Sequence, residues 1–344
     1  GISTSIIGIL PPAASAGVGV VIVLQLMRLA QCFGRGGTWG GGILMAYENV
    51  PENKRSFYAA IPQIGLPIGF GLSSILIAVP TLLLPEDIFF TWGWRIPFLA
   101  AIILTLIVIR QKGEMMETED YKKAQAKLEA EEAEGKKHKV GFIPMVKGYW
   151  KTLLLGCGTR WVDGTFYNIF IVWILSYCIN WLGMPLIQTY IITIIACIFK
   201  IPFTLFGGWC AQKLGNTRTF VIGALASAVL SIPTLKVIEL SKGNLAITII
   251  GIVLGWSIAY NLIWAVISSL WSSYFETEVR YSGISFVYHV PSFLVAGMVP
   301  TICTLLINYG KGDTIYVGIY STVVALISAA CALALKARHD RGEK

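Results

Sequence analysis

The sequence predicts an all-α membrane protein, and three observations lead to this fold class. Hydrophobic residues make up 55% of the 344 positions and charged residues only 13%, whereas a soluble domain usually carries about 25% charged residues. The hydrophobic residues occur in long runs, and a helix needs about 20 such residues to cross a bilayer. These runs lack the polar/apolar alternation of membrane-spanning strands. Helices also satisfy their own backbone hydrogen bonds, as the hydrocarbon core demands.

Nine complete spans are predicted from these runs. They cover residues 20–47, 57–80, 92–111, 149–181, 185–208, 217–237, 245–272, 281–308 and 314–336. Residues 1–14 look like the end of a tenth span. Because the chain opens inside an apolar stretch without an initiator Met or a charged leader, we expect Gly1 to be a truncation point.

One long polar segment, residues 112–148, separates the spans into two groups. Three complete spans precede it and six follow it, as in membrane proteins built from two related six-helix halves. We therefore divide the chain into a first helical part (1–111), a cytoplasmic linker (112–148), a six-helix part (149–336) and a cytoplasmic tail (337–344).

The basic residues are distributed unevenly between the two sides of the membrane. When the loops are assigned alternately, 19 of the 27 Lys and Arg residues fall on the side of the linker and four on the other side. Because Lys and Arg are enriched in cytoplasmic loops, the linker and the C-terminus are expected on the cytoplasmic face of the cell membrane. The net charge of +8 reflects this topology and does not indicate nucleic-acid binding.

Ionisable residues inside the spans point to function, because a charge in the hydrocarbon core is costly and usually faces a cavity or a partner. The set comprises Arg28, Arg35, Arg160, Asp163, Lys200 and His289. Four cations face one acid, so a cavity lined by them would be electropositive and would favour a small organic anion. We therefore predict Arg28, Arg160 and Lys200 as substrate contacts.

Purely structural roles for these residues remain open. Arg160 and Asp163 are three positions apart and can neutralise each other on one helix face. Arg28 can brace helix contacts through backbone carbonyls. Lys200 can extend its ammonium group toward the membrane surface.

Proton coupling requires a group that gains and loses a proton near the working pH. Asp163 is the one clear acid inside the predicted spans, and His289 is the only histidine inside one. Because histidine titrates near neutrality, we predict both as proton-coupling residues. For His289, a structural histidine that is hydrogen-bonded in the core is the alternative.

Tyr167 and Tyr288 lie inside spans and are expected to line the substrate pocket, although packing is the commoner use of such residues. The seven cysteines are scattered without a CxxC pair, so no metal site is predicted. The sequence contains neither a phosphate-binding loop nor an HExxH motif. We therefore predict no catalytic residue, no enzyme and no cofactor. The expected partners of a monomeric chain are the bilayer, a small organic anion and protons, whose gradient would drive the process.

Several segments carry recognisable motifs in a consistent order. Residues 28–38 (RLAQCFGRGGT), the stretch Glu48-Asn-Val-Pro51 followed by Lys54-Arg55, and residues 94–98 (WRIPF) precede the linker, while Gly208-x-x-x-Gln212-x-x-Gly215-Asn216 and residues 279–283 (VRYSG) follow it. Together they resemble the metabolite:proton symporter family of the major facilitator superfamily, which includes shikimate, α-ketoglutarate and proline/betaine permeases. The resemblance extends over essentially the whole chain.

The resemblance implies a fold of two six-helix halves, here without roughly the first two to three helices. Residues 1–111 would contain the end of the third to the sixth helix, and residues 149–336 the seventh to the twelfth. It also implies proton-coupled uptake of a small organic acid or zwitterion by alternating access. The gating residues implied by the matching motifs are Glu48, Arg55, Gln212, Gly215 and Arg280.

The chain departs from the family pattern at several of these positions. Thr38 stands where the family usually has Glu, and Gln212 and Asn216 replace the Asp and Arg of the superfamily's gating motif. These departures and the missing spans make a non-transporting or inactive truncated member one alternative to an organic-acid transporter. The resemblance itself leaves a zwitterion or osmolyte symporter as the other.

Overall fold

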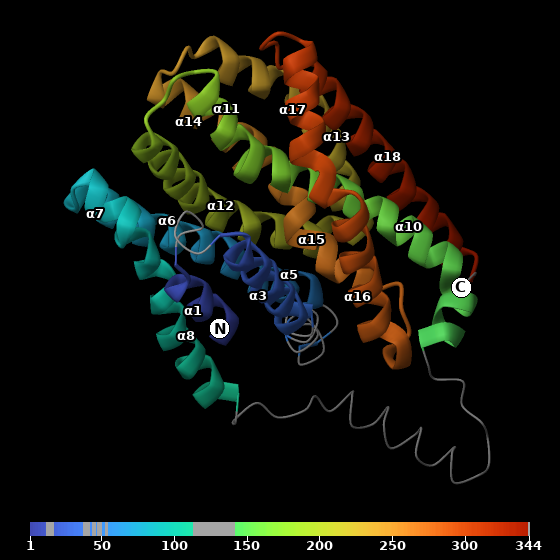
Figure 1. Ribbon diagram of the computed structural model, residues 1–344. Helices are drawn as coiled ribbons and strands as arrows, with labels where there is room; N and C mark the ends of the chain where they lie inside the picture. Colours follow the sequence, from blue (N-terminus) through green and yellow to red (C-terminus); the bar gives the residue numbers. More distant parts are fainter. Residues whose placement is uncertain are drawn as a thin grey trace. The chain divides into compact units, whose positions relative to one another are not determined.

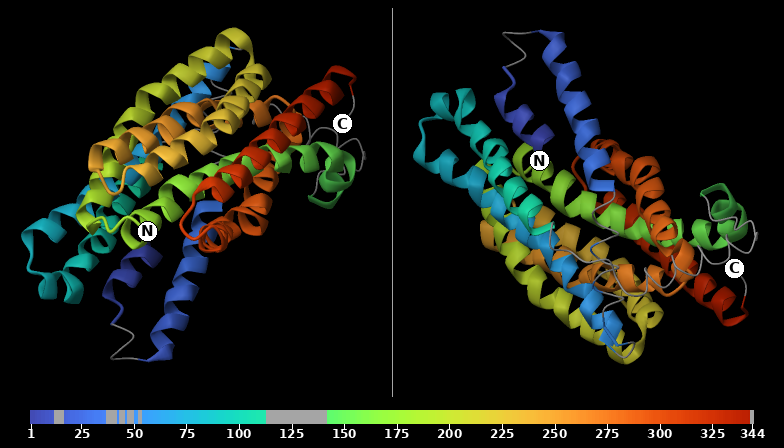
Figure 2. Two further views of the ribbon diagram at one scale, coloured as in Figure 1. Left: turned by 90° about the horizontal axis from the view of Figure 1, so that it is seen from above. Right: turned by 90° about the horizontal axis from the view of Figure 1, so that it is seen from below.

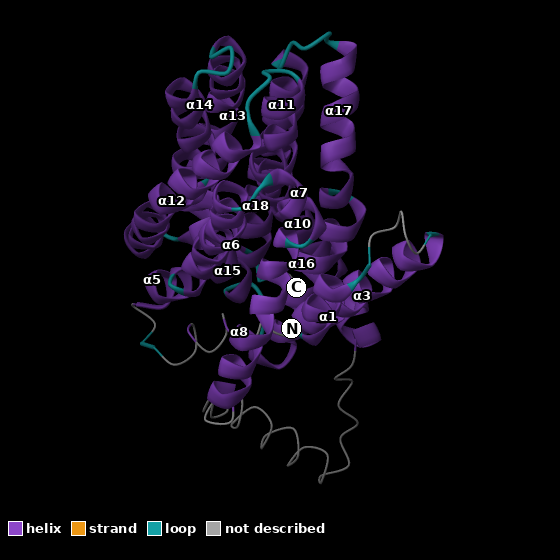
Figure 3. Cartoon of the chain, turned by 60° about the vertical axis from the view of Figure 1, so that its left-hand side comes forward, coloured by secondary structure: helices purple, strands orange, loops and turns teal. Residues whose placement is uncertain are grey.

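The computed structural model describes residues 1–11, 17–36, 42, 46, 50–51, 54–112 and 142–342. All regular structure in these residues is helical (Figures 1 and 3), which confirms the predicted fold class. The α-helices are α1 (Ile2–Ile9), α3 (Val18–Gly36), α5 (Arg55–Ala60), α6 (Gly65–Leu83), α7 (Glu86–Thr91), α8 (Ile96–Lys112), α10 (Phe142–Asn168), α11 (Ile174–Asn180), α12 (Leu186–Leu214), α13 (Asn216–Leu240), α14 (Leu245–Ile252), α15 (Asn261–Ser272), α16 (Thr277–Leu294), α17 (Val299–Tyr309) and α18 (Ile315–Asp340). Short 3₁₀ or π-helical turns are η2 (Pro62–Ile64), η3 (Gly93–Arg95), η4 (Ile169–Trp173), η5 (Val253–Ala259) and η6 (Ala296–Met298).

Eight helical stretches among the described residues are long and apolar enough to cross a membrane. They correspond to the eight spans predicted from residue 57 onward. The span predicted at residues 20–47 is described as a helix only for Val18–Gly36, and its apolar part, Val18–Cys32, is shorter than the other eight. The rest of that span lies largely outside the described residues.

The described residues fall into two compact units, which are treated separately below. The first unit comprises Gly1–Trp39 and Leu72–Glu117, and the second comprises Gly40–Gly71 and Thr118–Lys344. The division within the first part of the chain therefore falls inside α6. The domain boundaries predicted at the linker, most of which is not described, stay a prediction.

In the second unit, α18 packs lengthwise against α10 and α13 (Figures 1 and 2). Small residues make these contacts close, because they let helix backbones approach each other. A Cβ on Gly158 would lie 2.4 Å from the Cys331 sulfur, and one on Gly318 would lie 2.8 Å from Ile232. The Ser328 hydroxyl donates to the Gly158 carbonyl at 2.7 Å and so ties α18 to α10.

Two π-helical turns interrupt the helices of this unit. η4 follows α10, and η5 lies between α14 and α15. A π-turn adds a residue to the helical register, and such turns occur frequently at functional sites. Gly255 in η5 allows the Phe170 ring of η4 to approach, because a Cβ there would lie only 2.4 Å from the ring. The two irregular turns therefore pack directly on each other.

In the first unit, α1 lies against α8 and α3. A Cβ on Gly8 would lie 2.8 Å from the Phe98 side chain, so a small residue is needed at this crossing. The Arg95 guanidinium donates to the Leu10 carbonyl at 2.9 Å, and the Gln31 amide donates to the Thr4 hydroxyl at 2.7 Å.

Candidate functional site

A buried charge cluster lies inside the second unit, where α10, α12, η5 and α16 meet. Its first two members, Arg160 and Asp163, are one turn apart on α10 and are 6% and 1% exposed. An Arg160 Nη1 hydrogen points to Asp163 Oδ2, and the two side chains form an ion pair. The Tyr260 hydroxyl donates to the other carboxylate oxygen. Both oxygens of Asp163 therefore have a donor.

Arg160 is held in place by α16 as well as by Asp163. Its second terminal nitrogen, Nη2, donates to the Ser292 hydroxyl at 3.2 Å. Its guanidinium carbon lies 4.4 Å from the centre of the Tyr288 ring, one turn before Ser292. Among the described residues its Nε has no hydrogen-bond partner. The planar guanidinium is thus fixed by α10 and α16 while one donor stays unused.

Lys200 is the second cation of the cluster, and it is fully buried in α12. Its Nζ lies 4.4 Å from the centre of the Trp256 ring and 4.3 Å from that of Tyr260. Within the described part of the chain, Nζ has no hydrogen-bond partner. The two rings offset part of the cost of burying the ammonium group by cation–π attraction, but an unpaired buried charge remains expensive.

The Tyr260 ring connects the two charged groups. It accepts the Lys200 ammonium on its π-system and donates its hydroxyl to Asp163. The ring is stacked on Phe166, with the centres 6.1 Å apart and the planes inclined by 9°. Because Tyr260 directly follows η5, the π-turn sets the register that brings both Tyr260 and Trp256 toward α12.

The structure thus gathers four of the residues predicted from the sequence, Arg160, Asp163, Lys200 and Tyr288, into one cluster. Trp256, Tyr260 and Ser292, which were not among the predicted site residues, complete it. Trp256 lies in the π-turn η5 and Tyr260 directly follows it, so the α-helical spacing of the sequence does not place these two side chains. With two cations and one carboxylate, the cluster carries a net positive charge in its ionised form, which suits an anionic ligand.

Three predicted site residues lie elsewhere. Tyr167 is half-buried, and its ring meets Phe70 edge to face at 5.8 Å. His289 is exposed, although its ring contacts the cluster residue Tyr288 at 5.1 Å. Arg28 belongs to the first unit, where it is exposed and lines a cavity of about 300 Å³ with Leu24 and Trp94.

The predicted gating residues are partly brought together. Gln212, near the end of α12, accepts a hydrogen bond from the Phe57 backbone N–H at 3.3 Å. Gly208 makes this approach possible, because a Cβ there would lie 2.7 Å from the Ala60 side chain. Arg55 begins the same short helix, α5. The two sequence motifs that contain Arg55 and Gln212 therefore meet.

The remaining gating candidates occupy helix ends. Gly215 joins α12 to α13 with a φ of +90°, a conformation that favours glycine. Arg280, in the first turn of α16, donates through Nε to the Phe275 carbonyl at 3.2 Å. Glu48 and Thr38 lie outside the described residues, as does the side chain of Arg35.

A second charged cluster, called here the Lys236 cluster, lies at the far end of α13. The Lys236 ammonium donates to both oxygens of Glu239 at 3.0 Å and to Asp313 at 2.7 Å. Thr314 donates to Glu239 through its backbone N–H at 2.8 Å and its hydroxyl at 2.7 Å. The hydrogen bonds from Lys236 and from the Ile315 N–H hold the pKa of Asp313 below its ordinary value. This partly exposed cluster ties α13 to the turn before α18.

No group of three or more potential metal ligands occurs among the described residues. The geometry instead defines a helical membrane protein with a buried, electropositive cluster in its second unit.

Comparison with known proteins identifies the class more closely. Residues 1–300 match the Major Facilitator Superfamily. The chain is 29% identical to the shikimate transporter of Escherichia coli K12 over 98% of this chain and 75% of that protein. It is 31% identical to the inner membrane metabolite transport protein YhjE of the same organism, over 99% of this chain and 76% of that protein. A proline/betaine transporter of Salmonella typhimurium is 27% identical over 99% of this chain and 67% of that protein.

Solved structures show the same fold. A proton:xylose symporter, XylE, matches with a TM-score of 0.69 at 16% identity, over 96% of this chain and 78% of that one. The chain belongs to the major facilitator superfamily. The predicted resemblance to its shikimate, metabolite and proline/betaine branch is confirmed, and the chain is a multi-pass membrane transporter rather than an enzyme.

Proposed function

We propose that this protein is a secondary transporter that moves a small organic acid together with protons by alternating access. The observation that carries the proposal is the Lys200 ammonium group, which is fully buried between two aromatic rings and has no hydrogen-bond partner among the described residues. A buried charge is retained at a cost only where something compensates it. A substrate carboxylate supplies both the opposite charge and the missing acceptor.

Arg160 is the second group that would bind the substrate. Its guanidinium fork matches a carboxylate in two-point geometry, and at present it is engaged by Asp163 and Ser292. A substrate carboxylate that approaches Arg160 therefore competes with Asp163. Tyr288 and Tyr167, which belong to the same unit as Arg160, are proposed as further substrate contacts, and the role of Arg28 stays a prediction from the sequence.

This competition provides a route to proton coupling. When the substrate takes over the Arg160 contact, Asp163 loses its counter-charge and remains in a buried site, where an unpaired charge is costly. Proton uptake by Asp163 would then accompany substrate binding, and proton release would accompany the return of the Arg160–Asp163 pair. His289 is the second candidate for the proton step. No cofactor is needed, because the ion gradient supplies the driving force.

The relatives agree with a small carboxylate as substrate, since one is named a shikimate transporter. A zwitterion is the second candidate, because another relative is named a proline/betaine transporter and the Asp163 carboxylate beside the Tyr260 and Phe166 rings would suit a ligand ammonium group.

We also propose that the contact between Gln212 and the Phe57 backbone acts in gating. This contact joins the two motifs of Arg55 and Gln212, and with Glu48, Gly215 and Arg280 it would open and close one face of the transporter. By the positive-inside rule, this face, the linker and the C-terminus are cytoplasmic and the transporter works in the cell membrane.

Uptake into proteoliposomes tests the proposal. The purified chain is offered radiolabelled carboxylates, zwitterions and sugars, with and without an inward proton gradient. Carboxylate uptake that requires the gradient and stops on addition of an uncoupler is the expected result. Uptake of zwitterions alone would overturn the anionic substrate, and uptake that ignores the gradient would overturn proton coupling.

A further inference from the structure

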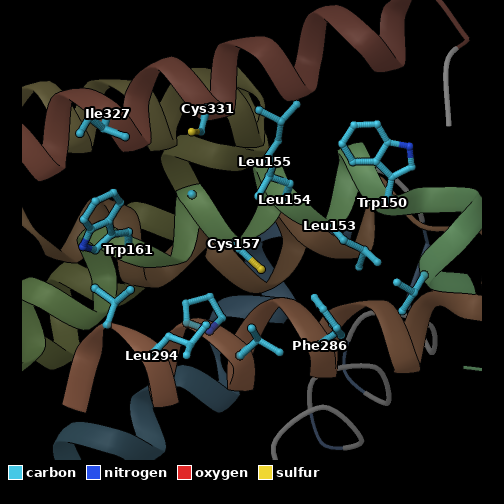
Figure 4. Close-up of a pocket in the computed structure, with 15 residues that line it drawn as sticks. Trp150, Leu153, Leu154, Leu155, Cys157, Trp161, Phe286, Leu294, Ile327 and Cys331 are labelled. Carbon is cyan, nitrogen blue, oxygen red and sulfur yellow. The ribbon is translucent and has the colours of Figure 1, made fainter. Parts of the chain in front are cut away.

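An apolar groove runs along α10 and is lined by residues of α10, α16 and α18 (Figure 4). It has a volume of about 590 Å³ and is bounded by α10, α16 and α18, all in the second unit. Trp150, Cys157 and Trp161 come from α10, Leu294 from α16 and Cys331 from α18. The volume lies within the range of about 300–1,000 Å³ that is typical of ligand pockets.

The groove is open on its outer side. Trp150 is 55% exposed and Leu154 64%, and Leu294 on the facing helix is 58% exposed. Because these helices are long and apolar enough to cross a membrane, the open side is expected at the depth of the lipid chains. The occupant must therefore be apolar and must come from the bilayer side.

The length of the groove matches one leaflet. Trp150 and Trp161 mark its two ends in Figure 4. Eleven helical residues separate them, which corresponds to about 16 Å at 1.5 Å per residue. This is about half of the 30 Å hydrocarbon core. A groove of this length accommodates one acyl chain that reaches from the interface to the bilayer centre.

Positive charge gathers at one end of the groove only. Lys147 and Lys151 lie four positions apart on α10, on either side of Trp150, and both are exposed. The Lys151 ammonium lies 5.4 Å from the centre of the Trp150 ring. Neither lysine forms an ion pair with a described carboxylate. Trp at the interface and unpaired lysines beside it suit the headgroup of an anionic lipid.

We propose that this groove is a binding site for an anionic phospholipid, with an acyl chain between α10, α16 and α18 and the headgroup phosphate at Lys147 and Lys151. Such a lipid would touch the helix turns that position the charged cluster. Trp161 and Pro291 line the groove, and their chain neighbours Arg160 and Ser292 form a hydrogen bond with each other. An occupied groove would thereby stabilise the Arg160–Ser292 contact.

The chain offers a matched control for the headgroup end. Lys213 at the end of α12 lies 4.2 Å from the ring centre of Trp209, which is 47% exposed. This Lys–Trp pair resembles the one at Lys151, but none of its residues lines the groove. If lipid binds in the groove, its affinity should depend on the Lys151–Trp150 pair and should not depend on the Lys213–Trp209 pair.

Native mass spectrometry of the purified full chain measures the binding, during titration with phosphatidylglycerol or phosphatidylcholine of identical acyl chains. Val290→Trp places an indole in the groove and is expected to weaken binding of both lipids about tenfold. Leu294→Trp serves the same purpose if Val290→Trp does not fold. The control Val229→Trp, at a position on α13 that is 72% exposed, should leave binding unchanged.

The double variant K147Q/K151Q is expected to lower the affinity for phosphatidylglycerol by about fivefold per lysine and to leave phosphatidylcholine binding unchanged. Lys213→Gln should have no effect. Unaltered phosphatidylglycerol binding by Val290→Trp would overturn the proposal. So would a dimer in light scattering that Val290→Trp dissociates, because the groove would then be a protein interface. No substrate is present, so the result is independent of the proposed transport activity.

Discussion

The cluster around Lys200 and the Lys236 cluster both place a lysine near carboxylates within the second unit, but they satisfy it differently. Lys236 donates to Glu239 and to Asp313 at 2.7–3.0 Å, and its side chain is 29% exposed. Lys200 is fully buried, and within the described part of the chain it has only aromatic rings as neighbours for its charge. The carboxylate nearest in the network, Asp163, is occupied by Arg160 and Tyr260.

This difference separates a structural ion cluster from a binding site. In the Lys236 cluster each charge is already satisfied, so the cluster can stabilise the fold without any ligand. Around Lys200 the described residues recover only part of the cost of burial, through the two aromatic rings, which leaves interaction energy for a ligand. The following predictions test this distinction, from the largest expected effect to the smallest.

Replacement of Lys200 by Gln should have the largest effect on transport. Loss of a buried charge that pairs with a substrate carboxylate is expected to reduce uptake at low substrate concentration by about a hundredfold. Thermal unfolding should not occur at a lower temperature, because the variant no longer buries an unpaired charge. The control Lys236→Gln should retain uptake. Normal uptake by Lys200→Gln would assign the lysine a structural role.

Replacement of Asp163 by Asn should impair both coupling and stability. The change leaves Arg160 buried without its counter-charge, which costs roughly 3 kcal/mol of unfolding free energy. Substrate exchange across the membrane should persist, while accumulation driven by a proton gradient should disappear. Uptake with an unchanged response to the gradient would exclude Asp163 as the proton carrier and would leave His289 for that role.

Replacement of Tyr260 by Phe isolates one hydrogen bond. The ring remains against Lys200 and Phe166, but Asp163 loses a donor, so we expect a loss of about 1–3 kcal/mol in unfolding free energy. Denaturant unfolding of the variant and the wild-type chain measures this loss. A variant with unchanged stability would show that the Tyr260 hydroxyl is not needed.

The Lys236 cluster should show a small effect that is confined to stability. The folded-state pKa of Asp313 is below its ordinary value of 3.8, so its contribution is present above pH 4 and is lost as the pH falls through the lower folded pKa. Asp313→Asn should remove this part of the acid destabilisation and leave uptake at neutral pH unchanged. Thermal unfolding measured between pH 3 and pH 6 checks the sign.

Much of the fold was accessible from the sequence, because lipid imposes strong constraints on spanning segments. The apolar runs predicted eight spans that the structure contains, such as Leu186–Leu214 and Asn216–Leu240. The rarity of intramembrane charge identified Arg160, Asp163 and Lys200. The cost of an unsatisfied backbone in lipid explains the long apolar runs, and the cost of a buried charge explains why intramembrane charges are rare. Both features can be read directly from the sequence.

The geometry of the site was less accessible. The π-turn η5 determines which residues surround Lys200, because it brings Trp256 and Tyr260 to α12. No hydrophobic periodicity in the sequence predicts this turn or its register. His289 was selected for its chemistry, yet it is exposed while its neighbour Tyr288 contacts Arg160. One position on a helix changes the direction of a side chain by about 100°, and span boundaries read from hydropathy do not resolve that angle.

The most direct test of the central claim, that Lys200 binds a substrate carboxylate, compares a transported acid with its neutral amide in proteoliposomes. The amide removes the charge from the ligand, as Lys200→Gln removes it from the protein. The wild-type chain should prefer the acid by about a hundredfold, and Lys200→Gln should take up the two compounds within a few fold of each other. Full preference for the acid in the variant would contradict the account, because the charge of Lys200 would then play no part in recognition.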